Sequence, residues 1–315
     1  MAPVTERLAA FGLRIANGFL LPAIEPIVAP RAAIPLRHPV IFIVGAPRSG
    51  STLLMQLVSD AFDIGYMSNG HCRYFGAPGL AEKLLSPLRG KRPSDFQSRH
   101  GATSRRYEPS ECAGWWYRFF PRDPAFVGVD DVEPARMRRM RRSLAALVNS
   151  FDRPVLLKNL YASVRLGPII QLFPEALFVV VSRDELENAR SLLRGRLQAT
   201  GSYSTWWSVP PPAVESLRSL PPHGQVVEQI RGIYAQIDRD FDEFGVSAGR
   251  ILRVRYESLC EHANRCIDEF GAFLARYSTR TERLFDIPPA FERRTESALD
   301  PELDAALARY IGCND

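Results

Sequence analysis

A short loop bracketed by glycines carries the residues best suited to chemistry. Residues 40–44 are all β-branched or aromatic, and this run ends abruptly at Gly45. The loop that follows contains Arg48 and closes at Gly50, and apolar residues then recur at helical spacing from Leu54 onwards. A strand, a tight loop and a helix in this order direct backbone N–H groups and the positive end of a helix dipole at one spot. The stretch therefore predicts a site for a phosphate or sulfate group.

The position of the positive side chain separates this loop from that of a nucleoside-triphosphatase. The spacing from Gly45 to Gly50 fits the first two glycines of a nucleotide-binding P-loop, but Ser51 stands where a triphosphatase has lysine. The cation here is Arg48, inside the loop. The pattern disfavours a P-loop kinase or triphosphatase, which stays an alternative together with a catalytically inactive nucleotide-binding module.

Further apolar segments end in charged residues and alternate with helical patterns. Residues 154–157 lead to Lys158, and residues 176–181 lead through Ser182 to Arg183. Uniformly apolar strands are typical of a parallel sheet that is covered on both faces. We therefore predict an α/β fold: a three-layer, doubly wound and mostly parallel sheet, with its ligand at the carboxyl edge where Gly45, Lys158 and Arg183 meet.

Composition narrows the classes of partner. The 315 residues carry a net charge of +5, without a dense basic stripe interleaved with aromatic residues, so we expect no nucleic-acid partner. The five cysteines show no C-x-x-C spacing and indicate reduced thiols, which predicts a cytoplasmic protein. No set of His, Asp and Glu has metal-ligand spacing, so we predict no metal site.

The N-terminal residues differ from the rest of the chain. We expect residues 1–36 to form a helical, proline-rich extension packed on a single domain of residues 37–315. Residues 8–28 are apolar, but Arg14 and several prolines interrupt them, so no transmembrane segment is predicted. A lipid-facing anchor with weak membrane contact, or a lid over an acceptor site, is the alternative to simple packing.

Four other stretches allow specific expectations. Residues 68–76 are rich in turn formers and predict a loop over an active site. The aromatic residues between 115 and 120 could belong to helices that cap the sheet or to an acceptor-binding wall. A helix is predicted from Pro134, with a solvated face of arginines. Arg293 and Arg294 could form a C-terminal phosphate clamp.

Four segments, in order between residues 40 and about 275, resemble sulfotransferases that use 3′-phosphoadenylyl sulfate (PAPS). Gly-Ala-Pro-Arg-Ser-Gly-Ser-Thr at 45–52 resembles their 5′-phosphosulfate loop, and Val-Val-Val-Ser-Arg-Asp at 179–184 followed by Ser191 resembles their 3′-phosphate site. Leu-Leu-Lys-Asn at 156–159 and Tyr-Glu-Ser-Leu at 256–259 also fit. The chain is most similar to the bacterial group that resembles tyrosylprotein and carbohydrate sulfotransferases.

The resemblance implies a P-loop-like sulfotransferase fold and metal-independent, in-line transfer of a sulfuryl group from PAPS to a hydroxyl acceptor. The product would be adenosine 3′,5′-bisphosphate, and the acceptor a small-molecule or lipid-like alcohol. Lys158 and Arg48 would stabilise the leaving oxygen. The implied contacts to PAPS come from Arg48, Ser49, Gly50, Ser51 and Thr52 at the phosphosulfate, Arg183 and Ser191 at the 3′-phosphate, and Tyr256 at the adenine.

The general base is not fixed by the resemblance. The cytosolic enzymes have a histidine two residues after the strand-end lysine, and this chain has Leu160 there. The tyrosylprotein-type enzymes place a glutamate in the loop after the first helix, where this chain offers His71. An imidazole is suited to accept a hydroxyl proton at neutral pH. His71, Glu108 and Glu111 are therefore the candidate bases.

Overall fold

A computed structural model describes residues 4–28, 35–88, 93–98, 101–278, 282–292 and 299–312. Its centre is a five-stranded sheet in the order β2-β3-β1-β4-β5, and all the paired strands are parallel. The strands are β1 (Val40–Val44), β2 (Gly65–Tyr66), β3 (Val155–Lys158), β4 (Leu177–Ser182) and β5 (Ile251–Arg255). The predicted doubly wound, parallel α/β sheet is confirmed.

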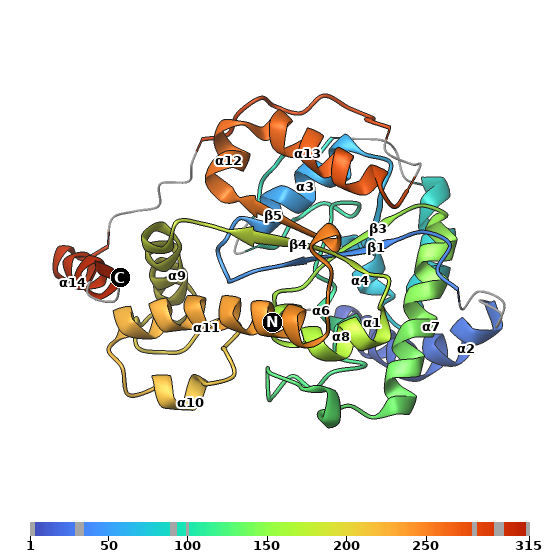
Figure 1. Cartoon of the computed structure of the whole chain (residues 1–315). Helices are drawn as coiled ribbons and strands as arrows, with labels where there is room; N and C mark the ends of the chain where they lie inside the picture. The colour runs from blue at the N-terminus through green and yellow to red at the C-terminus, as the bar shows by residue number, and fades with distance from the viewer. Residues whose placement is uncertain are drawn as a thin grey trace.

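The strand β1 shows why the sheet is covered on both faces. Its side chains alternate, so that Val40, Phe42 and Val44 enter one buried cluster and Ile41 and Ile43 enter another. Helices α3, α12 and α13 cover one face, and α7, α8 and α11 cover the other (Figure 1). The chain therefore forms three layers.

Helices lie on both faces of the sheet, and several of them are only one or two turns long. The α-helices are α1 (Val4–Ile15), α2 (Leu21–Val28), α3 (Ser51–Ala61), α4 (Asn69–Arg73), α5 (Pro78–Leu85), α6 (Ala113–Trp116), α7 (Pro134–Phe151), α8 (Leu166–Leu172), α9 (Glu185–Thr200), α10 (Val214–Leu217), α11 (Pro222–Glu243), α12 (Tyr256–Glu261), α13 (Ala263–Ala275) and α14 (Pro301–Gly312). The π-helix is η1 (Ala16–Leu20), and the 3₁₀ turns are η3 (Ser86–Leu88), η4 (Val129–Asp131), η5 (Leu160–Val164) and η6 (Ala248–Arg250).

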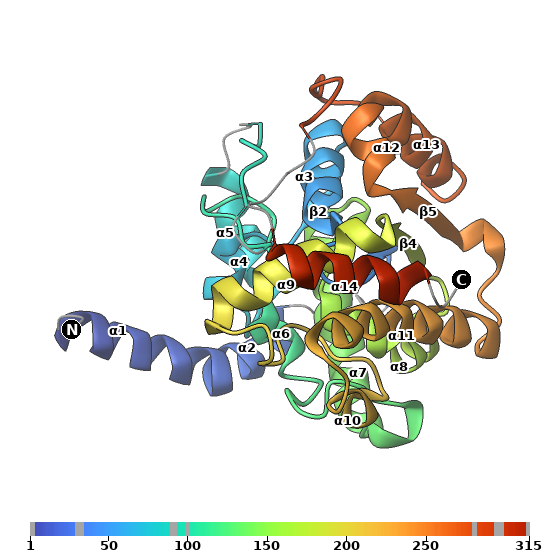
Figure 2. The same cartoon turned by 90° about the vertical axis from the view of Figure 1, so that its left-hand side faces the viewer.

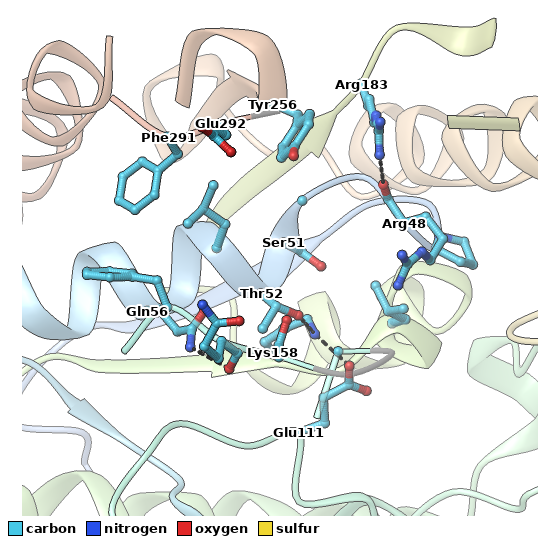
Figure 3. A pocket seen from close by; sticks show the side chains of 18 of the residues that line it. Arg48, Ser51, Thr52, Gln56, Glu111, Lys158, Arg183, Tyr256, Phe291 and Glu292 are labelled. Carbon is cyan, nitrogen blue, oxygen red and sulfur yellow. Dashed lines mark hydrogen bonds and ion pairs between the residues drawn. The ribbon is translucent and has the colours of Figure 1, made fainter. Parts of the chain in front are cut away.

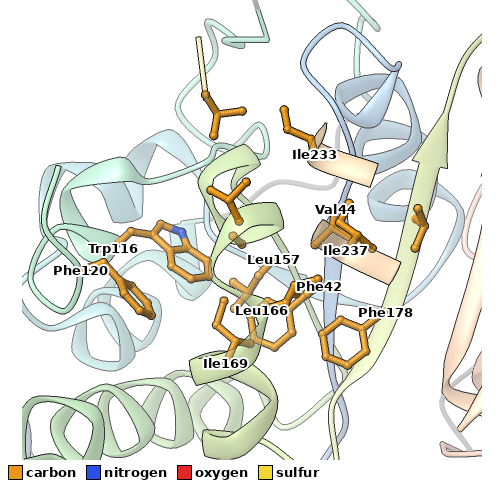
Figure 4. Close-up of a cluster of buried hydrophobic side chains, with 14 of the residues drawn as sticks. Phe42, Val44, Trp116, Phe120, Leu157, Leu166, Ile169, Phe178, Ile233 and Ile237 are labelled. Carbon is orange, nitrogen blue, oxygen red and sulfur yellow. The ribbon is translucent and has the colours of Figure 1, made fainter. Parts of the chain in front are cut away.

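The larger of the two clusters combines aromatic and aliphatic side chains (Figure 4). The ring of Phe42 stacks on Phe178 at 5.9 Å and meets Trp116 edge-on at 6.2 Å. Trp115 is also buried, and its Nε1 donates to Ser143 Oγ at 3.0 Å. The core interpretation of the aromatic residues near 115–120 is thus confirmed, and the interpretation as an acceptor wall is wrong for both tryptophans.

Of two further sequence-based expectations, one is confirmed and one is wrong. The predicted helix from Pro134 is α7, whose apolar stripe is buried while Arg138, Arg139 and Arg142 are exposed. The loop predicted at residues 68–76 is wrong, because it contains α4, whose first turn is capped by Ser68. Short polar residues favour loops and helix caps alike, so composition did not separate the two. The sequence analysis also did not anticipate α14, which packs on α9 and α11 (Figure 2).

Helices α1 and α2 and the π-helix between them form an N-terminal arm, residues 4–28. Helix α2 packs against α5 and α7, whereas α1 extends away from the body (Figure 2). Among the described residues, no helix has the length and apolar character needed to span a bilayer. The division of the chain at residue 36 stays a prediction.

Candidate active site

The loop after β1 is held against the strand ends at a point where only glycine fits. Gly45 has a φ of 152°, and a Cβ atom there would lie 2.3 Å from the carbonyl oxygen of Val181. The N–H of Gly45 donates to Ser163 Oγ at 3.0 Å. On the other side, Asn188 Nδ2 donates to the carbonyl of Pro47 at 2.7 Å. The loop is therefore fixed from β4, from α9 and from the turn after β3.

The second half of the loop turns sharply into α3. Arg48 has a φ of 67° and Gly50 a φ of 93°, both in the left-handed region that only glycine adopts freely. A Cβ atom on Gly50 would lie 2.3 Å from the ring of Tyr256, which packs directly on the loop. Helix α3 begins at Ser51, and the first N–H groups of a helix have no acceptor within it. The N-terminus of α3, with Ser51 and Thr52 in its first turn, therefore lies at the site.

Two guanidinium groups converge beside this N-terminus (Figure 3). Arg48 Nε donates to Ser191 Oγ at 3.0 Å, and Arg183 Nη1 donates to the carbonyl of Arg48 at 3.4 Å. The Arg183 guanidinium lies over the ring of Tyr256, 4.6 Å from its centroid. Its buried Nε has no hydrogen-bond partner within the described part of the chain. Its Nη2 lies 3.8 Å from Glu187 Oε2, a long ion pair that leaves the guanidinium able to bind an anion in the cavity.

A lysine–glutamate pair lies on the other side of α3. Lys158 Nζ donates to Glu111 Oε1 at 2.6 Å and to Thr52 Oγ1 at 2.8 Å (Figure 3). The lysine side chain is 2% exposed, whereas that of Glu111 is 30% exposed. The ammonium group is therefore fixed at the start of α3, and the carboxylate faces the open space.

These groups line a cavity of about 540 Å³ at the carboxyl edge of the sheet. The switch in strand order at β1 opens a crevice there, as doubly wound sheets predict. Its other walls come from residues 95–98, Gly101, Trp207, Ser208 and residues 288 and 290–292. Phe96 and Phe291 meet edge-on in these walls at 5.1 Å. The predicted meeting of the loop, Lys158 and Arg183 is confirmed.

Comparison with known proteins agrees with this arrangement. The family model described as the sulfotransferase family matches residues 39–274. The chain belongs to the sulfotransferase family. A search of curated proteins gives no match.

Two solved structures share the fold of this sulfotransferase at low sequence identity. Sulfotransferase STF9 from Mycobacterium avium has a TM-score of 0.56 at 15% identity, over 99% of this chain and 78% of that chain. Sulfotransferase STF1 from Mycobacterium tuberculosis H37Rv has a TM-score of 0.53 at 16% identity, over 88% of this chain and 78% of that chain. These neighbours confirm the predicted bacterial sulfotransferase fold.

Not every predicted contact residue of the sulfotransferase faces the cavity. Ser49 is fully buried beneath the loop, and its N–H donates to the carbonyl of Ala46 at 3.3 Å. Ser191 is also buried and meets the site through Arg48. Tyr234 lies beside Ser49 beneath the loop. Burial raises the pKa of Tyr234 to about 12, and its hydroxyl donates to the carbonyl of Val181 at 2.8 Å. Ser49 therefore shapes the loop, contrary to the direct contact that we expected.

The structure does not bring His71 to the cavity. The imidazole is fully buried, with Nδ1 accepting from the N–H of Ser68 at 3.1 Å and Nε2 lying 3.1 Å from Glu82. Its ring packs against Phe151 at 5.7 Å. An imidazole that caps a helix and is sealed in this way cannot reach a substrate, so we assign His71 a structural role instead of the expected catalytic one.

The two glutamate candidates separate clearly. Glu108 Oε2 accepts from the N–H of Arg105 at 3.3 Å, and the residue lines a different cavity of about 770 Å³. Glu111 alone of the three candidate bases borders the cavity of the loop. Arg293 and Arg294 lie outside the described residues.

The cavity walls contain residues that sequence analysis missed. Phe96, Gln97 and Gly101 come from a segment without regular pattern, and the expected tail contributes Phe291 and Glu292. A Cβ atom on Gly101, which has a φ of 85°, would lie 3.6 Å from the ammonium of Lys158. No local sequence pattern identifies these positions, because they belong to irregular segments whose path over the cavity is set by the tertiary fold.

Proposed function

We propose that this sulfotransferase moves a sulfuryl group from PAPS to a hydroxyl acceptor by in-line, metal-independent transfer. One observation carries the proposal. A single cavity holds two guanidinium groups, a helix N-terminus and a buried ammonium, and the ammonium is paired with a carboxylate that faces the cavity. The cations suit a nucleotide with several anionic groups, and the carboxylate suits a proton acceptor.

The donor half of the cavity fits the two charged ends of PAPS. The N–H groups of Ser51 and Thr52 and the side chain of Arg48 would hold the phosphosulfate. Arg183, whose Nε is buried without a partner among the described residues, would bind the 3′-phosphate. Ser191 would hold the Arg48 side chain in place through their hydrogen bond. PAPS supplies the activated sulfuryl group when it is bound.

Lys158 is the residue best placed to favour the departure of the nucleotide. Negative charge grows on the oxygen that bridges phosphate and sulfate as the bond from this oxygen to sulfur breaks. A buried ammonium fixed at the start of α3 stabilises this charge more in the transition state than in the ground state. One such contact typically contributes about 10²–10³ in rate.

Glu111 is the proposed general base. As the acceptor oxygen bonds to sulfur, its proton passes to the Glu111 carboxylate, which is reachable from the cavity. The ammonium of Lys158, 2.6 Å away, holds this carboxylate in place. The acceptor would be a small-molecule or lipid-like alcohol, because Leu160, Phe96 and Phe291 give the walls apolar surface.

Calorimetric titration with adenosine 3′,5′-bisphosphate tests the donor assignment. Arg183→Ala should weaken binding roughly 10–100-fold, because a charged hydrogen bond contributes roughly 1.5–3 kcal/mol. Arg253→Ala removes an exposed arginine that pairs with Asp238, and it should bind like the wild type. Equal binding by wild type and Arg183→Ala, or none by either, would disprove the assignment.

Turnover assays separate the proposed activity from its alternatives. With PAPS and a panel of phenols and alcohols, sulfate transfer should continue in the presence of EDTA. Magnesium-dependent ATP turnover that Arg48→Ala abolishes would favour a kinase or triphosphatase. Nucleotide binding without transfer to any acceptor would favour an inactive binding module.

A further inference from the structure

The N-terminal arm, residues 4–28, has its polar and apolar residues placed the opposite way to an ordinary surface helix. Asn17 and Glu25 are 2% and 7% exposed, whereas Phe19 and Ile27 are 76% and 78% exposed. Helices on the surface of a domain normally bury the apolar stripe and expose the polar one. The outward face of the arm therefore exposes apolar side chains that a binding partner would cover.

The buried polar residues fix this orientation. Asn17 Nδ2 donates to the carbonyl of Arg73 at 3.0 Å, and Asn17 Oδ1 accepts from the N–H of Gly76 at 2.8 Å. Glu25 Oε1 accepts from Ser143 Oγ at 3.0 Å, and Glu25 also pairs with Arg118 at 3.6 Å. Rotating the arm to hide its apolar face would break these contacts.

Exposed apolar side chains occur in all three parts of the arm. It combines aromatic and branched side chains, each 40% to 78% exposed: Phe11, Ile15, Phe19, Leu20, Ile24 and Ile27. Large apolar side chains that gather on an exposed surface mark an interaction site.

Exposed basic residues lie on the arm and on the helix that packs against it. Arg14 is exposed on α1 itself. Helix α7 packs against α2 and carries the exposed Arg138, Arg139 and Arg142, which have no carboxylate within 4 Å in the described part of the chain. Arg118, the partner of Glu25, has its pKa lowered chiefly by burial; Glu25 opposes this shift, and the charge of Arg139 adds a smaller lowering.

We propose that the N-terminal arm and the arginines of α7 form a docking surface for an anionic lipid bilayer. Aromatic and branched residues enter the boundary between headgroups and acyl chains, and adjacent arginines attract anionic headgroups. A second copy of the chain fits less well, because a two-fold interface would bury the same surface of both copies and bring two sets of basic residues into one interface. The proposal does not depend on the proposed reaction.

Sedimentation with vesicles of phosphatidylcholine, with and without phosphatidylglycerol, tests this surface. The wild type should bind the anionic vesicles more strongly, and added salt should weaken binding. Phe19→Ser combined with Ile27→Ser should reduce the partition coefficient by at least about tenfold. Leu197→Ser, which also changes an exposed leucine, should leave it unchanged.

The charge contribution has its own matched pair of variants. Arg138→Gln with Arg142→Gln should weaken binding to anionic vesicles by about tenfold. Arg265→Gln on α13 removes an exposed arginine elsewhere and should have no effect. Failure of the wild type to bind anionic vesicles, or wild-type binding by the Phe19→Ser and Ile27→Ser variant, would overturn the proposal. So would a dimer in solution that this variant dissociates, since a second copy would then cover the face.

Discussion

The two halves of the cavity are assembled in different ways. On the donor side, Arg48 and Arg183 come from loops that directly follow the adjacent strands β1 and β4, and a hydrogen bond from Arg183 to the backbone of Arg48 joins them. On the acceptor side, Glu111 comes from an irregular segment and reaches Lys158 across 47 positions of sequence. The position of the proposed anion site thus follows from sheet topology, whereas the position of the proposed base depends on the path of one long connection.

The largest effect should come from removing the carboxylate of the acceptor half. We expect Glu111→Gln to lower kcat by about 10²–10⁴, the typical contribution of a general base, because the amide cannot accept the proton. Binding of adenosine 3′,5′-bisphosphate should stay near that of the wild type. Glu108→Gln is the matched control and should keep its kcat. A full loss of nucleotide binding in Glu111→Gln would show that the halves are not separable.

Lys158 joins the two halves, so its substitution should affect catalysis more than binding. Lys158→Met keeps a long side chain but removes the charge, and we expect kcat to fall about 10²–10³. Single-turnover transfer rates at saturating PAPS measure this effect. If the change raised only KM for PAPS, the ammonium would serve ground-state binding alone.

Within the donor half, Arg48 and Ser191 should act as a unit. Their hydrogen bond of 3.0 Å predicts that Ser191→Ala weakens nucleotide binding by about tenfold through loss of a charged hydrogen bond. In a double-mutant cycle with Arg48→Ala, the effect of Ser191→Ala should largely disappear. Additive effects would mean that each residue acts on the nucleotide separately.

The smallest effect on catalysis should come from His71, which the sequence suggested as the base. His71→Asn breaks a buried contact with Glu82 at 3.1 Å, so we expect the free energy of unfolding to fall by about 1–3 kcal/mol. Denaturant unfolding measures this loss, and kcat per folded molecule should remain close to the wild type. A selective loss of kcat without loss of stability would return His71 to the reaction.

The sequence allowed the meeting of the loop, Lys158 and Arg183 to be predicted, because each of them ends or follows a short, uniformly apolar strand. Gly45, Lys158 and Arg183 all had to meet at one sheet edge once the strands were assigned as parallel. His71 and Glu111 could not be ranked in the same way. A histidine among turn residues has the same sequence signal whether it caps a helix or faces a substrate, and only the packing of Glu82 and Phe151 on its ring decides.

The polar contacts of the N-terminal arm have a consequence for trimming the chain. A protein shortened to begin at residue 37 would lose Asn17 as the acceptor for Gly76, and Glu25 as the partner of Ser143 and Arg118. Ser143 is in turn the acceptor for the indole of Trp115 in the aromatic core. Deletion of the arm would therefore leave the Gly76 N–H, the Ser143 hydroxyl and the Arg118 guanidinium without these partners, next to the aromatic core, and should destabilise that side of the protein.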